Sequence, residues 1–311
     1  VIIRPSYVIR GESMYIFHTL DDIEYLPEPL RDGLKNSSTT FQIETYIENA
    51  LEYDVDLVRD HKGNIVFTVC EHIEHAGVHS GDSGMISPPV KLSSAMQKKM
   101  KDISIQLSEK LNIIGPVNFQ FAVSGDDIYC IEANPRGSRT LPFLSKAFHL
   151  SLPQVATDAM LGEEISKYEV LESKFYSVKQ STFPFDRFLK DDMVLGPKMR
   201  STGETMGVDR ELEPAILKSY LGNYPWLQRP GKILISLADP NKHVVLPFLE
   251  SLSKLGYSFC ATAGTKKIIS EKGIECEEVQ KLGESGYTIL DALKNDGIVL
   301  VLNTPTNRGD S

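Results

Sequence analysis

A polar face runs along the β-hairpin expected in residues 117–134, and its side chains could bind a hard cation. Residues 117–123 alternate between polar and apolar side chains, which is typical of a strand with one buried face. A turn-forming Ser-Gly-Asp-Asp run follows, and the next residues read as a second strand. With the turn centred near Asp126, Gln120 is expected directly opposite Glu132 on the polar face.

Asn134 continues that face two residues beyond Glu132, so an amide, a carboxylate and a second amide are expected to converge. Mg²⁺ prefers oxygen ligands, uses few protein carboxylates and leaves its other positions to phosphate and water. Arg136 and Arg139 follow directly, and guanidinium groups suit phosphate or carboxylate oxygens. The pattern is compatible with a metal-assisted phosphoryl-transfer centre, but from spacing alone a solvated sheet edge is the more common explanation.

Several motifs around this hairpin resemble one known family. The run EANPR at residues 132–136, with Gln120 twelve residues before its glutamate, resembles the metal-binding signature of the ATP-grasp enzymes. The flanking motifs are RPSY at residues 4–7, GVHSGDS at residues 77–83 and SRT at residues 138–140. Together they resemble the carboxyl-terminal half of the carbamoyl-phosphate synthase large-chain family.

The resemblance implies that ATP phosphorylates carbamate, with Mg²⁺ or Mn²⁺ as the metal. The implied metal ligands are Gln120, Glu132 and Asn134. The implied catalytic residues are Arg4, His72, Asn134, Arg136 and Arg139. The implied nucleotide contacts are Arg4, Thr45, Ile47, Glu52, Gly77, Val78, His79, Ser80, Gln120 and Glu132. Among them, Thr45 and Ile47 would offer backbone groups to adenine, and Glu52 would accept the ribose hydroxyls.

The stretch after RPSY departs from the family pattern. A glycine-rich flap over the phosphates is usual there, whereas residues 8–11 read VIRG, with Arg10 where a glycine is usual. Arginine tolerates positive φ poorly, so the flap geometry is expected to differ from that of the family.

Three histidines and two glutamates lie within residues 71–79, a composition that could suggest zinc. The segment contains no HExxH on a helix face, and the glycines at positions 77 and 81 are typical of a loop whose backbone approaches a ligand. We therefore expect this loop to approach a ligand rather than to bind a zinc ion, and the resemblance implies that the ligand is the nucleotide.

The composition is that of an ordinary globular protein of 311 residues, with 41% hydrophobic and 24% charged residues. A net charge of −9 argues against nucleic-acid binding, since phosphate backbones need clustered lysine and arginine. The four cysteines form no CxxC pair, which fits a reducing compartment. No apolar run of 18 residues and no signal peptide are found, so we expect a cytoplasmic protein without a membrane partner. The opening VIIR, without methionine, suggests a fragment.

The expected fold is α/β in two parts: an α+β ATP-grasp portion, and then a doubly wound parallel α/β domain that is methylglyoxal-synthase-like. A helix is predicted at residues 92–111, followed by helical segments at 141–162 that are broken at Pro153. Strands and helices alternate from residue 232 onward, which indicates a parallel sheet. The expected domains are 1–162, lacking its amino-terminal part, a connecting segment at 163–228, and an apparently truncated effector domain at 229–311.

Polar residues at the expected carboxyl ends of the later strands could bind a phosphate monoester. The run TAGT at residues 262–265 precedes a helix, so its amides and hydroxyls can hold an anion, although single hydroxyls there are more often helix caps. By resemblance, this is the site of an allosteric effector such as UMP, IMP or ornithine. The candidate effector contacts are Ser236, Lys242, Thr262, Gly264, Thr265, Lys281 and Asn303.

The resemblance also implies partners: a glutaminase small chain that supplies ammonia, and the amino-terminal half of the large chain, which makes carbamate. Two alternatives remain open. The segment could belong to the amino-terminal half, which phosphorylates bicarbonate, but RTLPF at residues 139–143 and the effector domain favour the carboxyl half. It could also be a non-catalytic regulatory module that binds a nucleotide or effector. By itself the segment is expected to be inactive.

Overall fold

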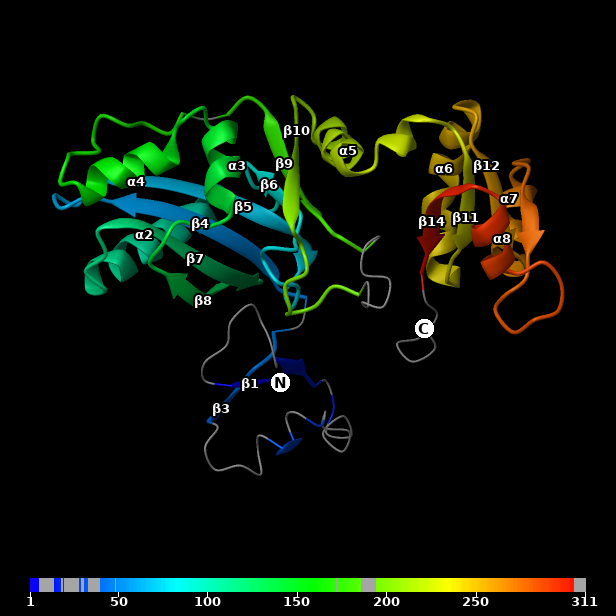
Figure 1. Ribbon diagram of the computed structural model, residues 1–311, viewed down its shortest axis with the longest axis horizontal. Helices are drawn as coiled ribbons and strands as arrows, with labels where there is room; N and C mark the ends of the chain where they lie inside the picture. Colours follow the sequence, from blue (N-terminus) through cyan, green and yellow to red (C-terminus); the bar gives the residue numbers. More distant parts are fainter. Residues whose placement is uncertain are drawn as a thin grey trace. The chain divides into compact units, whose positions relative to one another are not determined.

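The chain divides into two compact units, Val1–Asn223 and Tyr224–Ser311 (Figure 1). The structure is a computed structural model. It describes residues 1–5, 14–17, 19, 28, 31–32, 40–47, 49–171, 173–185 and 194–304. The flap residues 8–11, including Arg10, lie outside the described residues.

The first unit is built on a seven-stranded sheet with the order β10-β9-β6-β5-β4-β7-β8. Each hydrogen-bonded pair in it is antiparallel. Its strands are β4 (Leu51–Arg59), β5 (Ile65–His75), β6 (Met85–Ser87), β7 (Gly115–Ser124), β8 (Asp127–Asn134), β9 (Tyr176–Thr182) and β10 (Gly203–Asp209). The inner strand β4 lies between β5 and β7, whereas β10 and β8 end the order.

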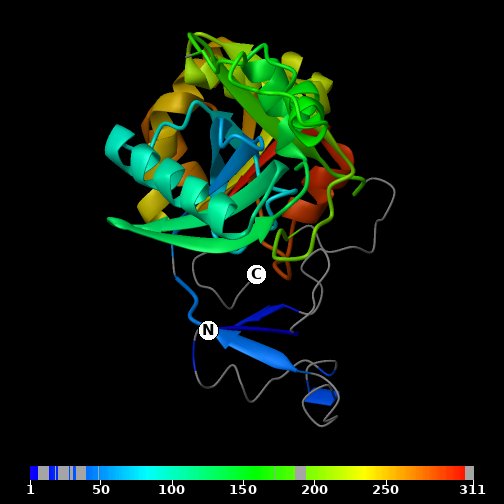
Figure 2. The ribbon, with the colours of Figure 1, turned by 90° about the vertical axis from the view of Figure 1, so that its left-hand side faces the viewer.

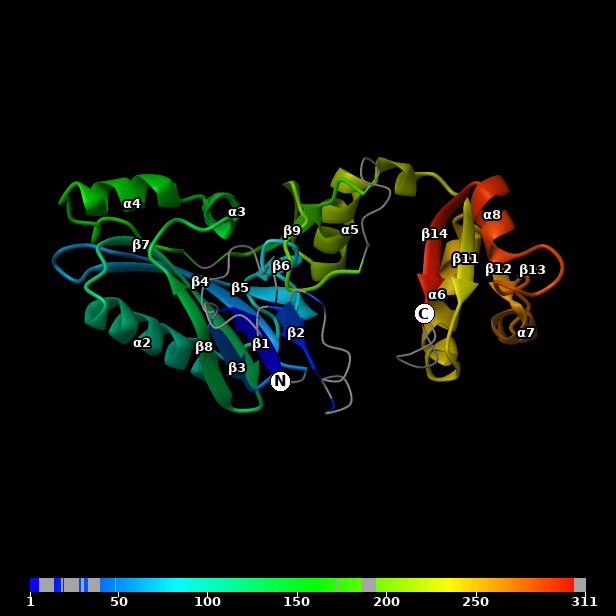
Figure 3. The ribbon, with the colours of Figure 1, turned by 60° about the horizontal axis from the view of Figure 1, so that its bottom comes forward.

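The two faces of this sheet are covered by different helices (Figure 3). Odd-numbered residues of β4, such as Val55 and Leu57, pack against α2 (Ser94–Lys110). On the opposite face, Val58 and its neighbours pack against α3 (Thr140–Ala147) and α4 (Leu152–Met160). The period-two pattern of a strand thus sends alternate residues to two separate cores, and the part of the second face that α3 and α4 do not cover carries polar groups.

Helix α2 lies where the sequence predicts it. The hydroxyl of Ser93 accepts a hydrogen bond from the backbone N–H of Met96 at 3.2 Å, which caps the first turn. Met100 is fully buried, and Ile103 and Leu107 pack beside it at helical spacing. The helix therefore fixes the buried face of the hairpin that follows it.

The predicted break at Pro153 is wrong. Helix α3 ends at Ala147 and α4 begins at Leu152, so the break spans residues 148–151 and Pro153 lies in the first turn of α4. Proline fits there because the first amides of a helix have no partner within the helix. His149, with φ of 51°, and the N-cap Ser151 mark the turn between the two helices.

Much of the expected connecting segment 163–228 instead belongs to the first unit. Strand β9 pairs with β6 and β10, and α5 (Leu212–Asn223) packs on both β9 and β10. Gly207 of β10 lies so close to α5 that a Cβ there would collide with the carbonyl oxygen of Ala215. Because such pairing joins strands far apart in sequence, local patterns do not reveal it. The short helix η2 (Pro225–Gln228) begins the second unit.

A small antiparallel sheet with the order β2-β1-β3 precedes the large one. Its strands are β1 (Ile2–Pro5), β2 (Tyr15–Ile16) and β3 (Phe41–Glu44). The blue strands of this sheet lie side by side in Figure 2. The strand predicted at residues 41–47 ends at Glu44, and Thr45 and Ile47 follow it as irregular chain.

The second unit is a parallel sheet with the order β13-β12-β11-β14. Its elements are β11 (Lys232–Ser236), α6 (Asp239–Lys254), β12 (Ser258–Thr262), α7 (Ala263–Glu271), β13 (Glu277–Val279), α8 (Ile289–Asn295) and β14 (Ile298–Asn303). Helices α6 and α7 pack on one face and α8 on the other, which confirms the doubly wound arrangement. Strand β13 is an addition to the predicted elements. Among the described helices of either unit, none is both long and apolar enough to span a bilayer.

Candidate active site and effector site

The predicted pairing across the hairpin is confirmed. Gln120 of β7 lies opposite Glu132 of β8, and Asn118 lies opposite Asn134. The turn itself pairs Ser124 with Asp127, and a bulge before Glu132 shifts the register by one residue. The bulge therefore places Glu132, rather than its neighbour, beside Gln120.

The donors gathered on this face fit a hard cation. The side-chain N–H of Asn134 donates to Glu132 Oε1 at 2.8 Å, and the amide oxygen of Asn134 has no partner among the described residues. Glu132 is exposed, while Gln120 and Asn134 are half-buried. In the described residues, no group of three or more His, Cys, Asp and Glu side chains is arranged to hold a metal. A cation at this place would therefore use the two amide oxygens as well as the carboxylate, a set that suits Mg²⁺ or Mn²⁺.

An acidic row on β4 continues the same face of the sheet. Glu52, Asp54 and Asp56 alternate along the strand, and Asp54 lies opposite Gln120. Asp54 and Asp56 are 3% and 5% exposed. Neither aspartate is among the site residues predicted from the sequence, although acids at every second position of an otherwise apolar strand indicate a polar face.

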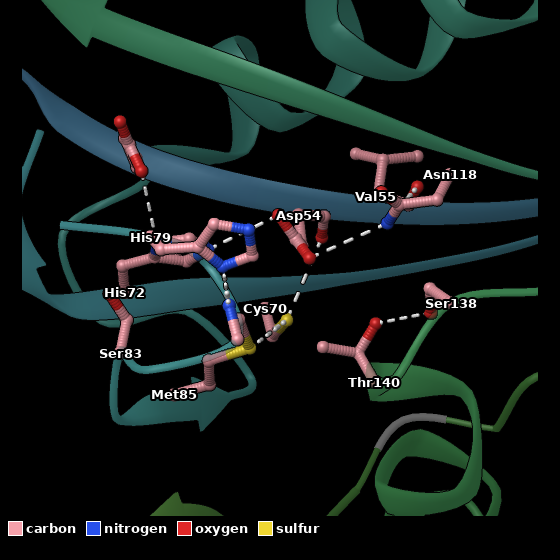
Figure 4. A network of polar contacts seen from close by, with 12 residues as sticks. Asp54, Val55, Cys70, His72, His79, Ser83, Met85, Asn118, Ser138 and Thr140 are labelled. Atoms are coloured by element: carbon pink, nitrogen blue, oxygen red, sulfur yellow. Dashed lines mark hydrogen bonds and ion pairs between the residues drawn. The ribbon is translucent and has the colours of Figure 1, made fainter. Parts of the chain in front are cut away.

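His72 of β5 lies between two carboxylates of this row. Its Nδ1 is 3.2 Å from Glu52 Oε2, and its Nε2 is 3.2 Å from Asp54 Oδ1 (Figure 4 shows Asp54 beside the ring). Burial would lower the pKa of His72, but Asp54 and Glu52 outweigh it and raise the pKa to about 9. His72 is therefore an imidazolium at neutral pH. Glu52, predicted to accept ribose hydroxyls, is paired with His72 in this structure, and its side chain is 12% exposed.

Asp56 connects β4 to the loop that carries the arginines. Its Oδ2 accepts hydrogen bonds from the hydroxyls of Ser138, at 2.8 Å, and Thr140. Its Oδ1 lies 3.4 Å from the side-chain N–H of Asn118. Burial raises the pKa of Asp56 to about 6, and the hydrogen bonds from Thr140 and Ser138 act against that rise. Figure 4 shows Ser138 and Thr140 meeting below β4.

The three predicted arginines differ in their surroundings. Arg4 forms a two-pronged ion pair with Glu44, at 3.1 and 2.8 Å, so its guanidinium is engaged. The hydrogen bond to Glu44 raises the pKa of Arg4, and the charge of Glu132 adds to the rise, which places Arg4 within electrostatic reach of the hairpin. Arg136 is exposed and donates to the carbonyl oxygen of Gly137 at 3.1 Å. Arg139 is exposed and lies directly before α3.

The predicted nucleotide loop at residues 77–83 is held at both ends. Gly77 has φ of +110°, and Tyr46 lies against it and donates to the carbonyl oxygen of Ala76. Asp82 is buried and accepts the backbone N–H groups of residues 200 and 201, each at 2.8 Å. The predicted contacts between these anchors are half-buried: Val78, His79 and Ser80.

His79 of this loop is affected by the charge of Glu132 in the hairpin. Its backbone N–H donates to the carbonyl oxygen of Gly196 at 2.9 Å, and its Nδ1 accepts from the backbone N–H of Gly81 at 2.9 Å. Burial lowers the pKa of His79, and the charges of Asp82 and Glu132 oppose that change. A neutral ring here can take part in hydrogen bonding without adding charge.

A second polar cluster lies at the carboxyl edge of the parallel sheet. Ser236 and Asn303 lie opposite each other at the ends of β11 and β14, and Thr262 ends β12. The Thr262 hydroxyl lies 3.5 Å from that of Ser236. Thr265 accepts the backbone N–H of residue 237 at 3.1 Å. The structure thus brings four of the predicted effector residues to one edge.

Lys242 carries the charge of this cluster. It is 9% exposed, and its Nζ bonds Asp239 at 2.6 Å. A Cβ added at Gly264, in the first turn of α7, would lie 3.2 Å from Nζ. A helix amino terminus already carries partial positive charge, so a buried ammonium there favours an anion between them. Lys281 is exposed and lies two residues beyond β13.

Comparison with known proteins agrees with these observations. Residues 1–167 match the family model described as "Carbamoyl-phosphate synthase L chain, ATP binding domain". The chain belongs to the carbamoyl-phosphate synthase large-chain family. Residues 244–311 match a second model, described as "MGS-like domain". The predicted resemblance is therefore confirmed for both parts.

Carbamoyl phosphate synthase large chains from several bacteria are similar along nearly the whole chain. The protein from Xanthomonas axonopodis pv. citri is 39% identical over 318 residues, covering 99% of this chain and 29% of its own length. The protein from Myxococcus xanthus is 40% identical over 309 residues, covering 98% of this chain and 28% of its own length. The chain thus spans less than a third of these relatives.

Solved structures support the predicted fold class. N5-carboxyaminoimidazole ribonucleotide synthetase from Thermus thermophilus superimposes with a TM-score of 0.54 at 16% identity, covering 73% of this chain and 61% of that chain. The synthetase from Thermotoga maritima gives a TM-score of 0.52 at 17% identity, covering 71% and 60%. At this identity, the similarity concerns the fold alone, which is ATP-grasp-like.

Proposed function

We propose that the first unit transfers the γ-phosphoryl group of ATP to carbamate, giving carbamoyl phosphate and ADP, within a glutamine-dependent carbamoyl-phosphate synthase. The observation that carries the proposal is the meeting of Gln120, Glu132 and Asn134 on one sheet face, in a chain of this family. Oxygen donors of this kind, with arginines nearby, are what phosphoryl transfer requires of a protein.

The reaction forms one bond and breaks another. A carbamate oxygen bonds to the γ-phosphorus while the bond from that phosphorus to its bridging oxygen breaks, and ADP leaves with the electron pair. Gln120, Glu132 and Asn134 would hold Mg²⁺ or Mn²⁺, which when bound supplies charge neutralisation at the β- and γ-phosphate oxygens. Asn134 also orients the Glu132 carboxylate through its 2.8 Å hydrogen bond.

Arginines supply the remaining positive charge. Arg136 and Arg139 are exposed beside the hairpin, where they can neutralise carbamate and the transferring group. Arg4 would contribute a nucleotide-phosphate contact. For this, its guanidinium would have to bind phosphate oxygens in addition to Glu44 or in place of it.

His72 acts in this proposal as a fixed charge rather than as a base. With a pKa of about 9 and a carboxylate at each ring nitrogen, it has no free lone pair at neutral pH. Its two contacts orient Glu52 and Asp54 at the edge of the site. Glu52 would then present its remaining oxygen to the ribose hydroxyls.

The rest of the nucleotide would lie along the chain between the small sheet and the loop. Thr45 and Ile47 follow β3 and would offer backbone groups to adenine. The backbone and side chains of Gly77, Val78, His79 and Ser80 would contact the phosphates. The positive φ of Gly77 supports this role, because it lets the backbone approach a ligand closely.

The complete enzyme would need parts beyond this segment. A glutaminase small chain would supply ammonia, and the amino-terminal half of the large chain would make the carbamate; the family relationship supports both. The product would feed pyrimidine and arginine biosynthesis in the cytoplasm. By itself the segment would not complete carbamoyl phosphate synthesis, because it would supply only the second phosphorylation.

Glu132→Gln in a full-length large chain tests the assignment. Loss of the only carboxylate in the metal set should lower ADP formation from carbamate by about 100- to 1000-fold. Asp127→Asn is the matched control, because Asp127 is an exposed acid at the start of the same strand. Near-normal turnover by Glu132→Gln, with Asp127→Asn also active, refutes the assignment.

A regulatory role of the second unit is a second candidate, favoured by Lys242 of α6, whose Nζ lies beside Gly264 in the first turn of α7. In this proposal an anionic effector such as UMP or IMP binds among the sheet-edge hydroxyls; ornithine is the cationic alternative. If the segment were only a regulatory module, calorimetry would detect effector binding without Mg-ATP binding. Binding of Mg-ATP that Glu132→Gln weakens favours the catalytic proposal instead.

A further inference from the structure

We propose that Asp56 is a positioning residue that ties the Ser138–Thr140 loop to β4 and so holds Arg139 in place for phosphoryl transfer. The inference rests on the function proposed above. Asp56 itself reaches no substrate, since its side chain is buried in the middle of the inner strand β4.

The hydrogen bonds around Arg139 carry the inference. Ser138 and Thr140 lie on either side of it in the chain, and both hydroxyls donate to the same oxygen of Asp56. Ser138 Oγ also accepts the backbone N–H of Leu141 at 3.1 Å. One carboxylate thus fixes the residues before and after the arginine together with the first turn of α3.

The second oxygen of Asp56 connects this loop to the hairpin. It faces the side-chain N–H of Asn118 at 3.4 Å, and that same group lies 3.5 Å from Asp54 Oδ2. Asn118 in turn lies opposite Asn134. Asp56 therefore contacts both the arginine loop and Asn118, the residue that lies across the hairpin from the proposed metal ligand Asn134.

A purely structural explanation accounts poorly for a charge at this place. In the described part of the chain, no lysine, arginine or histidine forms an ion pair with Asp56. Burial of a carboxylate without a cation is costly, and burial accordingly raises its pKa to about 6. An apolar side chain at position 56 would avoid this cost, but it would leave the hydroxyls of Ser138 and Thr140 without the oxygen that accepts their hydrogen bonds.

A double-mutant cycle in a full-length large chain tests the inference. Asp56→Ala should lower kcat for ADP formation from carbamate by about 100-fold, the effect of misplacing a catalytic group by about 1 Å. In an Arg139→Ala background the same change should lower kcat by less than about threefold, because the group it positions is already absent.

Asp56→Asn should keep kcat within about threefold of wild type, since an amide can donate to the two hydroxyls and accept from Asn118. Asp60→Ala is the matched control: Asp60 is a buried aspartate at the end of β4 that holds the turn at residues 62–64. Its loss should lower stability equally in both backgrounds without coupling to Arg139. Hydrogen exchange at residues 136–141 should quicken in Asp56→Ala and not in Asp60→Ala.

The outcomes separate this inference from the proposed function. Losses in kcat that add in the double variant, or an unchanged kcat in Asp56→Ala, overturn the positioning role alone. Arg139→Ala with normal kcat overturns the proposed function of that arginine and this inference with it. If Asp56→Ala does not fold, Ser138→Ala replaces it in the same cycle, with additivity again deciding against the role.

Discussion

The pairing of His72 with two carboxylates predicts a specific pH dependence of stability. An unfolded histidine has a pKa of about 6.5, and His72 has one of about 9 in the folded chain. Each tenfold difference in proton affinity corresponds to about 1.4 kcal/mol, so proton binding by His72 stabilises the fold by about 3 kcal/mol. Because the folded state holds its proton more tightly, this contribution is complete below about pH 6.5 and is lost as the pH rises through about 9.

The assay compares the whole chain with His72→Gln. Urea unfolding followed by far-UV circular dichroism gives the free energy of unfolding at several pH values between 6 and 10. The wild type should be the more stable at pH 6, and its advantage should shrink by about 3 kcal/mol by pH 10. An NMR titration of the histidine ring protons should independently show one imidazole with a pKa near 9.

His61→Gln is the matched control, because His61 is exposed in the turn between β4 and β5. Its stability should follow the wild type at every pH. A stability difference between wild type and His72→Gln that stays constant from pH 6 to 10 would refute the reasoning. So would a His72 ring that titrates near pH 6.5, since the two carboxylates would then not be acting on it.

The remaining predictions concern packing and the effector site. Gly207→Ala should lower the free energy of unfolding by about 3 kcal/mol, because the added Cβ would meet the backbone of α5. The control Gly196→Ala adds a Cβ in open space and should change the free energy of unfolding by less than about 0.5 kcal/mol. Equal effects of the two substitutions in urea unfolding would contradict this prediction. Lys242→Met should weaken the binding of UMP or IMP at least about tenfold in calorimetry, because the buried ammonium is lost. The control Lys254→Met, at an exposed lysine, should leave the affinity unchanged. An unaltered affinity in Lys242→Met would exclude this lysine from the site.

The hairpin shows how far local patterns lead. Alternation in residues 117–123 fixes which side chains share a face, and the turn residues fix the partner strand to within one position. The bulge that brings Glu132 opposite Gln120 has no local sequence signal, because it depends on how β8 settles against β7. The pair was predicted correctly, but the irregularity that produces it was not.

The buried network shows what local patterns do not contain. Asp54 and Asp56 alternate in a readable way, but their partners come from β5, β7 and the loop before α3. These hydrogen bonds join residues that are 18 to 84 positions apart in the sequence. Such pairs meet because of the order of the strands in the sheet, and the periodicity of a single strand does not reveal that order. For the same reason, β9 and β10 were assigned to a connecting segment, although they extend the large sheet through β6.

Strand β8 has a single hydrogen-bonded neighbour in the described sheet, yet it carries both Glu132 and Asn134. An outermost strand opens more readily than an inner one, because only one ladder must separate. A cation held between Gln120 and Glu132 would act as a cross-link from β7 to β8. Binding of the cation should then slow amide hydrogen exchange in β8, at the edge of the sheet, and leave the exchange rates of the inner strands unchanged.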